Sequence, residues 1–178
     1  MKSQRKICLS FHNLFISKFD SIEDQRIFDE VDQLISEQDE SLQKIALDYL
    51  GKKYKKVRNS MEHLKELLSD KKEIRKMHEK FTLTNIHVTE ALIGVLIGIL
   101  KRTSKERANQ QRENRRIIAE SCVRLNNQQF LNDLLKELCN EESMMSVDMH
   151  LLIIPYLQDK STATNQLIEL TLKIFENE

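Results

Sequence analysis

The run from Ala91 to Leu100 constrains the fold of this chain more than any other stretch, because it has no charged and no polar side chain. A helix that is apolar on every face lies inside a protein or inside a lipid bilayer. The run is about ten residues long, whereas a membrane-spanning helix needs roughly 20. Glu90 precedes it and Lys101 follows it. It therefore predicts the central helix of a protein core, with no transmembrane segment and no membrane partner.

Two glycines interrupt this apolar run. Gly94 and Gly98 are four residues apart, which places them on one helical face. Each glycine costs a helix about 1 kcal/mol relative to alanine. The pair therefore predicts that another helix packs its backbone closely against this face, which would offset that cost.

Glycine and proline are scarce in the rest of the chain as well. The 178 residues include three Gly and one Pro, so few positions suit sharp turns. Charged residues make up 31% of the chain, and the abundant Lys, Glu, Leu, Ile and Gln all favour helix or tolerate it. The composition predicts an all-α protein with little or no strand, in a single domain spanning residues 1–178.

Apolar residues recur at three- and four-residue steps along most of the sequence, as in amphipathic helices. The predicted helices cover residues 4–18, 22–36, 42–68, 87–102, 105–125, 130–140, 144–158 and 163–175. The stretch 42–68 fits one helix or two, with a break near Gly51 or Ser60. Residues 69–80 fit either a helix end or a mobile loop. Pro155 lacks an N–H donor and should kink or divide the helix around it.

Short turns between successive amphipathic helices imply antiparallel neighbours, either in a closed bundle or in a stack of helix hairpins. Gly94–Ser104 and Leu151–Ser161 align as two copies of one pattern, in which an apolar helix leads into a polar turn. An apolar helix on Leu167, Ile168, Leu170 and Leu172 follows the second copy.

With this pattern, residues 86–178 resemble the armadillo/HEAT family of helical repeats. The resemblance implies antiparallel helix hairpins stacked as a short armadillo/HEAT-like solenoid. Residues 1–80 would add N-terminal helices to that stack. A compact helical bundle remains the alternative.

Residues that usually carry chemistry are isolated in this sequence. No Gly-rich loop or strand–turn–helix elbow is present to support phosphate binding or nucleophilic catalysis. The five histidines form no HxxxH or HExxH pair, and Cys8, Cys122 and Cys139 form no CxxC pair. We therefore expect no enzymatic activity, no cofactor and no metal site. The odd cysteine count and the absence of an apolar leader favour reduced thiols in a cytoplasmic or nuclear protein.

Residues 101–116 are strongly basic, although the net charge of the chain is zero. Guanidinium and amide groups on one helix could bind a peptide backbone and its acidic side chains. A solvated helix face is the plain structural alternative. The residues that we predict to bind a partner are Lys105, Asn109, Arg112, Arg115 and Arg116.

These patterns favour a non-enzymatic adaptor or scaffold that binds a peptide or helix of another protein. One alternative is a nucleic-acid-associated helical protein that uses the same basic residues. Nucleic acid is the weaker choice, because the stretch has no interleaved aromatics for base stacking. The other alternative is a regulatory helical bundle that forms a homodimer.

Overall fold

A computed structural model describes residues 31, 33–103, 106–140, 144–158, 161, 164–165, 167–169 and 171–172. The described residues form helices and turns and contain no strand, which confirms the predicted all-α class. The elements are α3 (Glu40–Lys53), the 3-10 helix η1 (Lys55–Val57), α4 (Arg58–Ser69), α5 (Lys71–Arg75), α6 (Met77–Lys80), α7 (Ile86–Thr103), α8 (Ala108–Arg124), α9 (Gln128–Asn140), α10 (Met144–Ile153) and the 3-10 helix η2 (Ile154–Tyr156).

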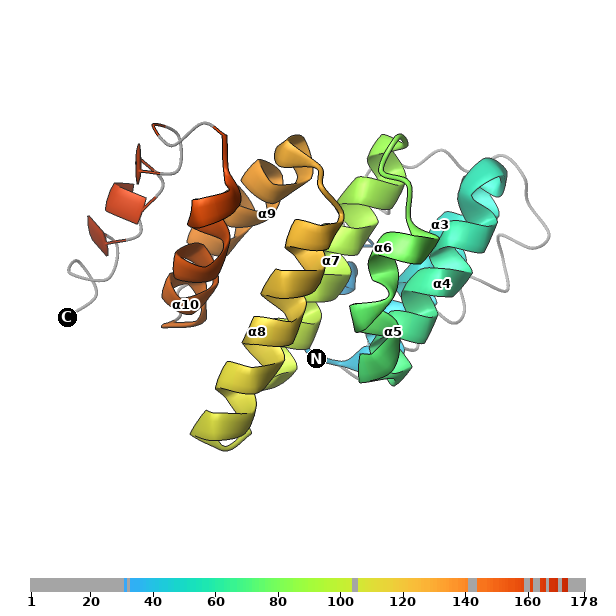
Figure 1. Ribbon diagram of the computed structural model, residues 1–178. Coiled ribbons are helices and arrows are strands. Elements are labelled where there is room, and N and C mark those ends of the chain that lie inside the picture. The colour runs from blue at the N-terminus through green and yellow to red at the C-terminus, as the bar shows by residue number, and fades with distance from the viewer. Residues whose placement is uncertain are drawn as a thin grey trace.

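The helices succeed one another across the molecule in chain order. Figure 1 shows α3 and α4 at one side, α7 and α8 in the middle, and α9 and α10 toward the other side. Helix α7 packs against α3, α4, α8 and α9, and α8 also contacts α5, α6 and α10. One continuous hydrophobic cluster runs from Val31 to Leu157.

Helix α7 is the central helix that the apolar run predicts. Residues on all of its faces are buried, including Leu92, Val95, Leu96 and Leu100, each fully enclosed. Its start lies where the sequence offers a cap, because Asn85 Oδ1 accepts a hydrogen bond from the backbone N–H of His87 at 3.0 Å.

The two glycines of α7 do meet a closely packed segment. A Cβ atom on Gly94 would lie 2.6 Å from Ile35 Cγ2, and one on Gly98 would lie 2.5 Å from the backbone oxygen of Glu37. Residues 31 and 33–35 are helical, and the chain then turns through residues 36–39 into α3. The close approach is therefore confirmed, and its partner is the segment 31–38. The backbone that meets Gly98 belongs to the turn at Glu37, however, and not to another helix as predicted.

Gln43 joins this segment to α7 from inside the core. Its side chain is fully buried, and Nε2 donates to the backbone oxygen of Ile35 at 2.5 Å and weakly to that of Val95 at 3.4 Å. Its Oε1 accepts a hydrogen bond from the half-buried guanidinium of Arg102. Burial lowers the pKa of Arg102, while the carboxylates of Glu40 and Asp39 favour its charged form.

The sequence left open how residues 42–68 divide, and the structure places the break at Tyr54. There the backbone leaves the helical region (φ −101°, ψ 72°), and η1 leads into α4. The Tyr54 ring stacks on the ring of His87 at the start of α7, with centroids 3.8 Å apart. Gly51 lies inside α3 and Ser60 inside α4, so neither residue breaks a helix.

Residues 69–80 form two short helices, not the helix end or the mobile loop that their high charge suggested. Asp70 caps α5 by accepting a hydrogen bond from the backbone N–H of Lys72 at 2.8 Å. Ile74 and Met77 are buried and attach α5 and α6 to the core. Lys80 of α6 adds ion pairs with Glu66 and Glu73, each at 2.5 Å, so apolar and polar contacts together hold this segment.

The C-terminal part follows its predicted boundaries. Helix α9 ends at Asn140 as expected, and α10 ends just before Pro155, where η2 begins. Residues 164–165, 167–169 and 171–172 are helical, as predicted, but Ile168 and Leu172 are more than half exposed. The predicted helix at 4–18 lies outside the described residues, as does most of the one at 22–36.

Candidate partner-binding surface

Helix α8 carries most of the residues predicted to bind a partner, and its packing decides which of them are accessible. The helix lies between α7, α5, α6 and α10. Asn114, Arg115, Ile118, Ala119, Ser121 and Cys122 are buried on its inner face. Its outer face presents Asn109, Arg112, Arg116, Glu120 and Arg124 to solvent.

Three of the five predicted residues therefore share an exposed face, namely Asn109, Arg112 and Arg116. Arg115 is only 7% exposed, and its Nη2 lies 3.4 Å from Gln111 Oε1 on the same helix. The structure therefore places this predicted contact residue on the inner face of α8, turned toward the neighbouring helices. Lys105 lies outside the described residues.

Arg116 is exposed to solvent, but its charge is paired with a carboxylate of the same helix. Its Nε lies 2.8 Å from Glu120 Oε1, one helical turn further along α8. This hydrogen bond lowers the pKa of Glu120, and the charges of Arg116, Arg124 and Arg75 lower it further, while partial burial acts in the opposite direction. The same hydrogen bond raises the pKa of Arg116.

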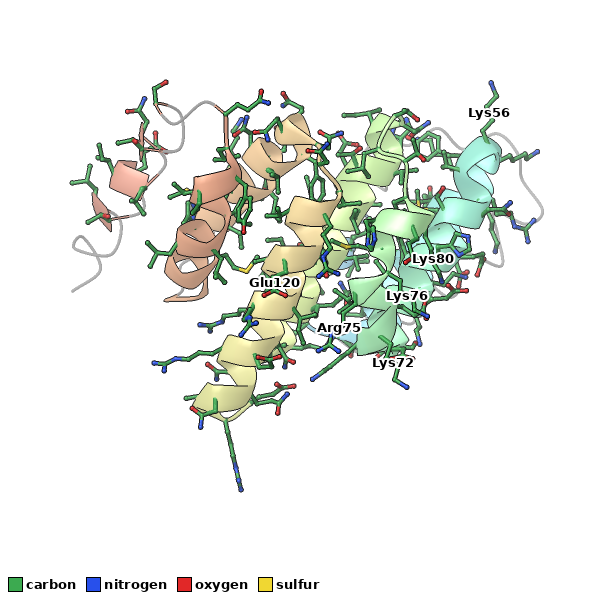
Figure 2. The ribbon with its side chains drawn as sticks, in the orientation of Figure 1. Lys56, Lys72, Arg75, Lys76, Lys80 and Glu120 are labelled. Atoms are coloured by element: carbon green, nitrogen blue, oxygen red, sulfur yellow. The ribbon has the colours of Figure 1, made fainter. Side chains whose placement is uncertain are left out.

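The influence of Arg75 on Glu120 reveals cations that sequence reasoning missed. Arg75 belongs to α5, and α5 packs beside α8. Lys72, Arg75 and Lys76 are exposed, and Figure 2 shows them on the same side of the molecule as Glu120. The high charge of residues 69–80 was visible in the sequence, but nothing there indicated that α8 lies next to them.

Polar contacts fix how α5 sits on α8. Lys71 Nζ donates to Asn114 Oδ1 at 3.1 Å and lies 3.6 Å from Glu106 Oε1. The amide of Asn114 also donates to the Glu106 carboxylate. Lys71 therefore bonds to α8 itself, whereas Lys72, Arg75 and Lys76 are exposed to solvent. We call the exposed set the α5–α8 basic surface, which consists of Lys72, Arg75, Lys76, Arg112, Arg116 and Arg124.

A second basic cluster lies elsewhere on the molecule. Lys52, Lys55, Lys56 and Arg58 are exposed at the end of α3 and in the turn that follows. In Figure 2, Lys56 lies at the far end of α3, away from Glu120 on α8. This cluster has the same kind of charge in a different place, so it serves as a control for the α5–α8 basic surface.

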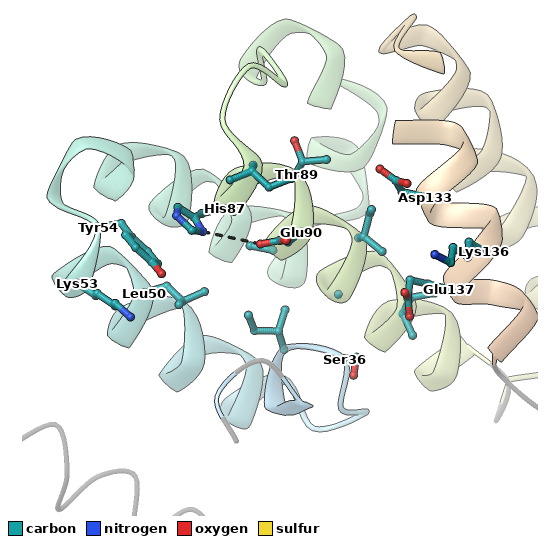
Figure 3. A pocket seen from close by; sticks show the side chains of 16 residues that line it. Ser36, Leu50, Lys53, Tyr54, His87, Thr89, Glu90, Asp133, Lys136 and Glu137 are labelled. Carbon is teal, nitrogen blue, oxygen red and sulfur yellow. Dashed lines mark ion pairs between the residues drawn. The ribbon is translucent and has the colours of Figure 1, made fainter. Parts of the chain in front are cut away.

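A groove of about 580 Å³ opens between α3, the first half of α7, and α9 (Figure 3). Its walls contain both apolar and polar residues, and Ile93, Gly94 and Ile97 of α7 provide apolar surface. Charged side chains at its edges include the carboxylate of Glu90, which lies 3.8 Å from the ring nitrogen of His87. No sequence pattern indicated this groove, because the residues of its walls are far apart along the chain.

Among the described residues, no group of three or more His, Cys, Asp or Glu side chains could hold a metal ion. Cys122 and Cys139 are buried thiols, and burial raises the pKa of Cys122. His150 is fully buried, with Nε2 3.3 Å from Cys139 Sγ. In the described part of the chain, no helix has the length and apolar character needed to cross a bilayer.

The fold and this surface define an all-helical protein with an exposed basic face built from two helices. Comparison of the chain with known protein families, curated proteins and solved structures found no match.

The position of α5 beside α8 can be tested through the pKa of Glu120. We expect Arg116→Gln to raise this pKa most, because its hydrogen bond is the main cause of the lowering, and Arg75→Gln to raise it by a smaller amount. In the wild type, the ion pair forms near neutral pH and is lost as the pH falls through the lowered pKa of Glu120. The pKa is read from an NMR titration of the side-chain carboxyl carbon.

Lys56→Gln provides the control for this titration, because Lys56 lies away from Glu120 and should leave its pKa unchanged. An unchanged Glu120 pKa in Arg75→Gln would contradict the packing of α5 described above.

Proposed function

We propose that this protein is a non-enzymatic adaptor that binds an acidic segment of a partner protein along the α5–α8 basic surface. The observation that carries the proposal is that exposed cations of two helices meet around Glu120. Arg75 of α5 and Arg116 and Arg124 of α8 all act on its carboxylate. Exposed Lys72 and Lys76 lie on the same side of the molecule as Glu120 in Figure 2. Guanidinium groups form bidentate hydrogen bonds with carboxylates, and these are among the stronger polar contacts in proteins.

The charge pattern of the surface favours a peptide over nucleic acid. Glu113 and Glu120 lie among its cations on α8 and would repel a continuous phosphate backbone. A protein segment can present acidic groups to the arginines and basic or amide groups to the glutamates. Asn109, on the same exposed face, supplies an amide that can bond to a peptide backbone.

We further propose that the helices form a short armadillo/HEAT-like stack. Their order across Figure 1 supports this arrangement, as do the short connections between α7 and α8 and between α8 and α9. Stacked helix pairs present extended surfaces for partner binding. In such a stack, α8 would be a helix that faces the partner.

The proposal is tested by reversing charge at Lys72, Arg75 and Arg116. The probe is a fluorescent peptide of alternating Glu and Leu, with binding measured by anisotropy. We expect the triple Glu variant to lose at least about tenfold in affinity. Three exposed pairs at about 0.5 kcal/mol each amount to ~1.5 kcal/mol, and 1.4 kcal/mol is tenfold.

The matched control reverses Lys52, Lys55 and Lys56, which changes the net charge by the same amount at the second cluster. It should keep most of the affinity, apart from a loss through long-range attraction that salt suppresses. Equal losses of peptide affinity in both variants, or no loss in either, would contradict the proposal.

The same protein is titrated with single- and double-stranded DNA at several salt concentrations. A steep fall of log affinity with log salt, abolished by the α5–α8 reversal, would favour the nucleic-acid alternative.

A further inference from the structure

The groove between α3, α7 and α9 has apolar walls and charged edges. Leu50 of α3 and Ile93 and Ile97 of α7 are among its apolar lining residues, and Ile86 at its edge is 60% exposed. Figure 3 shows Lys53 on one side and Asp133, Lys136 and Glu137 of α9 on the other. An opening with an apolar floor and a polar rim suits the apolar face of an amphipathic helix.

The described structure begins beside this groove. Residues 1–30 precede the helical residues 31 and 33–35, of which Val31, Leu34 and Ile35 are buried in the core. Ile35 and Ser36 themselves line the groove. The N-terminal segment is therefore tethered at the groove wall, so that it acts at high effective concentration compared with any separate partner.

The sequence of that segment has the apolar spacing and the charge that suit this groove. Residues 4–18 are predicted to form a helix, and Phe11, Leu14 and Phe15 share its apolar face. Residues 1–19 contain four Lys or Arg and no Asp or Glu, whereas the groove is lined by Glu90, Asp133 and Glu137 against Lys53 and Lys136. Cations of the helix can therefore pair with the excess of carboxylates at the rim.

We propose that residues 4–18 form a helix that occupies the α3–α7–α9 groove of the same chain. Its phenylalanines fill the apolar floor and its cations face the rim carboxylates. The tethered helix acts as an internal occupant that a competing amphipathic helix of a partner would have to displace. This inference concerns a different face from the α5–α8 basic surface and does not depend on the function proposed for that surface.

The test places a nitroxide on the polar face of the predicted helix, at Asn13→Cys in a Cys8→Ser background. Cys122 and Cys139 are 0% and 3% exposed and will not compete for the label. Methyl NMR of the full chain then reports proximity, because paramagnetic broadening falls steeply with distance. We expect several-fold greater broadening at Leu50, Ile93 and Ile97 than at Ile74 and Ile118, which do not line the groove.

Two further variants separate docking from mere tethering. Phe15→Asp puts a charge on the apolar face and should abolish the selective broadening. Ser10→Asp adds the same charge on the polar face and should preserve it. Methyl dispersion in each variant checks that the core stays folded.

Absent or uniform broadening in the parent chain would overturn the proposal. A second sample mixes nitroxide-labelled chains without isotope and isotope-labelled chains without nitroxide. Groove broadening in this mixture would also overturn it, because a second copy would then be the occupant.

Discussion

Replacing Gln43 by leucine is expected to lower the free energy of unfolding by about 2–4 kcal/mol. The change roughly preserves side-chain volume but leaves the buried backbone oxygen of Ile35 without its 2.5 Å hydrogen bond and removes an acceptor from Arg102. Each buried polar group that loses its partner costs about 1–3 kcal/mol. Urea unfolding followed by circular dichroism measures the change as a shift in midpoint.

The control for this substitution is Gln110→Leu, which makes the same chemical change on the exposed face of α8. Substitutions at such sites usually stay within about 0.5 kcal/mol of the wild type. Similar losses at both positions would mean that Gln43 acts through helix propensity rather than through its buried hydrogen bonds.

A double-mutant cycle tests the link to Arg102. Arg102→Met removes the cation that Gln43→Leu would leave partly unpaired. We expect the double variant to lose less stability than the sum of the two single losses, by at least about 0.5 kcal/mol. Additive losses would contradict a shared network.

Gly98→Ala is expected to lower the free energy of unfolding by up to about 2 kcal/mol, although alanine normally stabilises a helix. The added methyl group would lie 2.5 Å from the backbone oxygen of Glu37 and would also collide with Gln43 Nε2. Crowding in a packed core costs about 1–3 kcal/mol, and the gain in helix propensity of about 1 kcal/mol recovers only part of this.

Gly51→Ala is the matched control, because Gly51 is also buried and helical but has space for a methyl group. Its Cβ would come no closer than 3.5 Å to Met61 Cβ, which is ordinary contact. This variant should gain up to about 1 kcal/mol from helix propensity. Opposite signs for the two glycines are the expected result in denaturant unfolding. A Gly98→Ala protein as stable as the wild type would show that the segment 31–38 does not pack against α7 as described.

These experiments bear on the same junction, where the segment 31–38, α3 and α7 meet. If the N-terminal helix occupies the α3–α7–α9 groove, this junction also positions it, because Ile35 both packs on Gly94 and lines the groove. Variants that loosen the junction should therefore weaken the docking of residues 4–18 as well as the core.

Local sequence patterns were sufficient to predict features that depend only on residues close together in the chain. The apolar run gave the central helix α7, Pro155 gave the end of α10, and Asn85 and Asp39 supplied the caps of α7 and α3. Each of these depends on residues within about a turn of one another, which the sequence displays directly.

The candidate surface was only partly predictable. The basic character of residues 101–116 was plain, and the structure leaves Arg112 and Arg116 of this stretch exposed. The burial of Arg115 depends on which helices pack around α8, and periodicity in such a polar stretch does not reveal that. The cations of α5 were missed because their role depends on a neighbour more than thirty residues away in the sequence.

The sequence by itself determined that this chain is helical, where its core helix lies, and the bounds of α7, α8 and α9 to within about three residues. These properties follow from short-range hydrogen bonding, side-chain spacing and the scarcity of Gly and Pro. The tertiary structure alone decided which cations share a surface, which arginine is buried and where a groove opens. Those properties arise from packing between segments that are distant in the chain. The free energy of that packing depends on both segments of each contact, so the sequence of one segment alone does not reveal it.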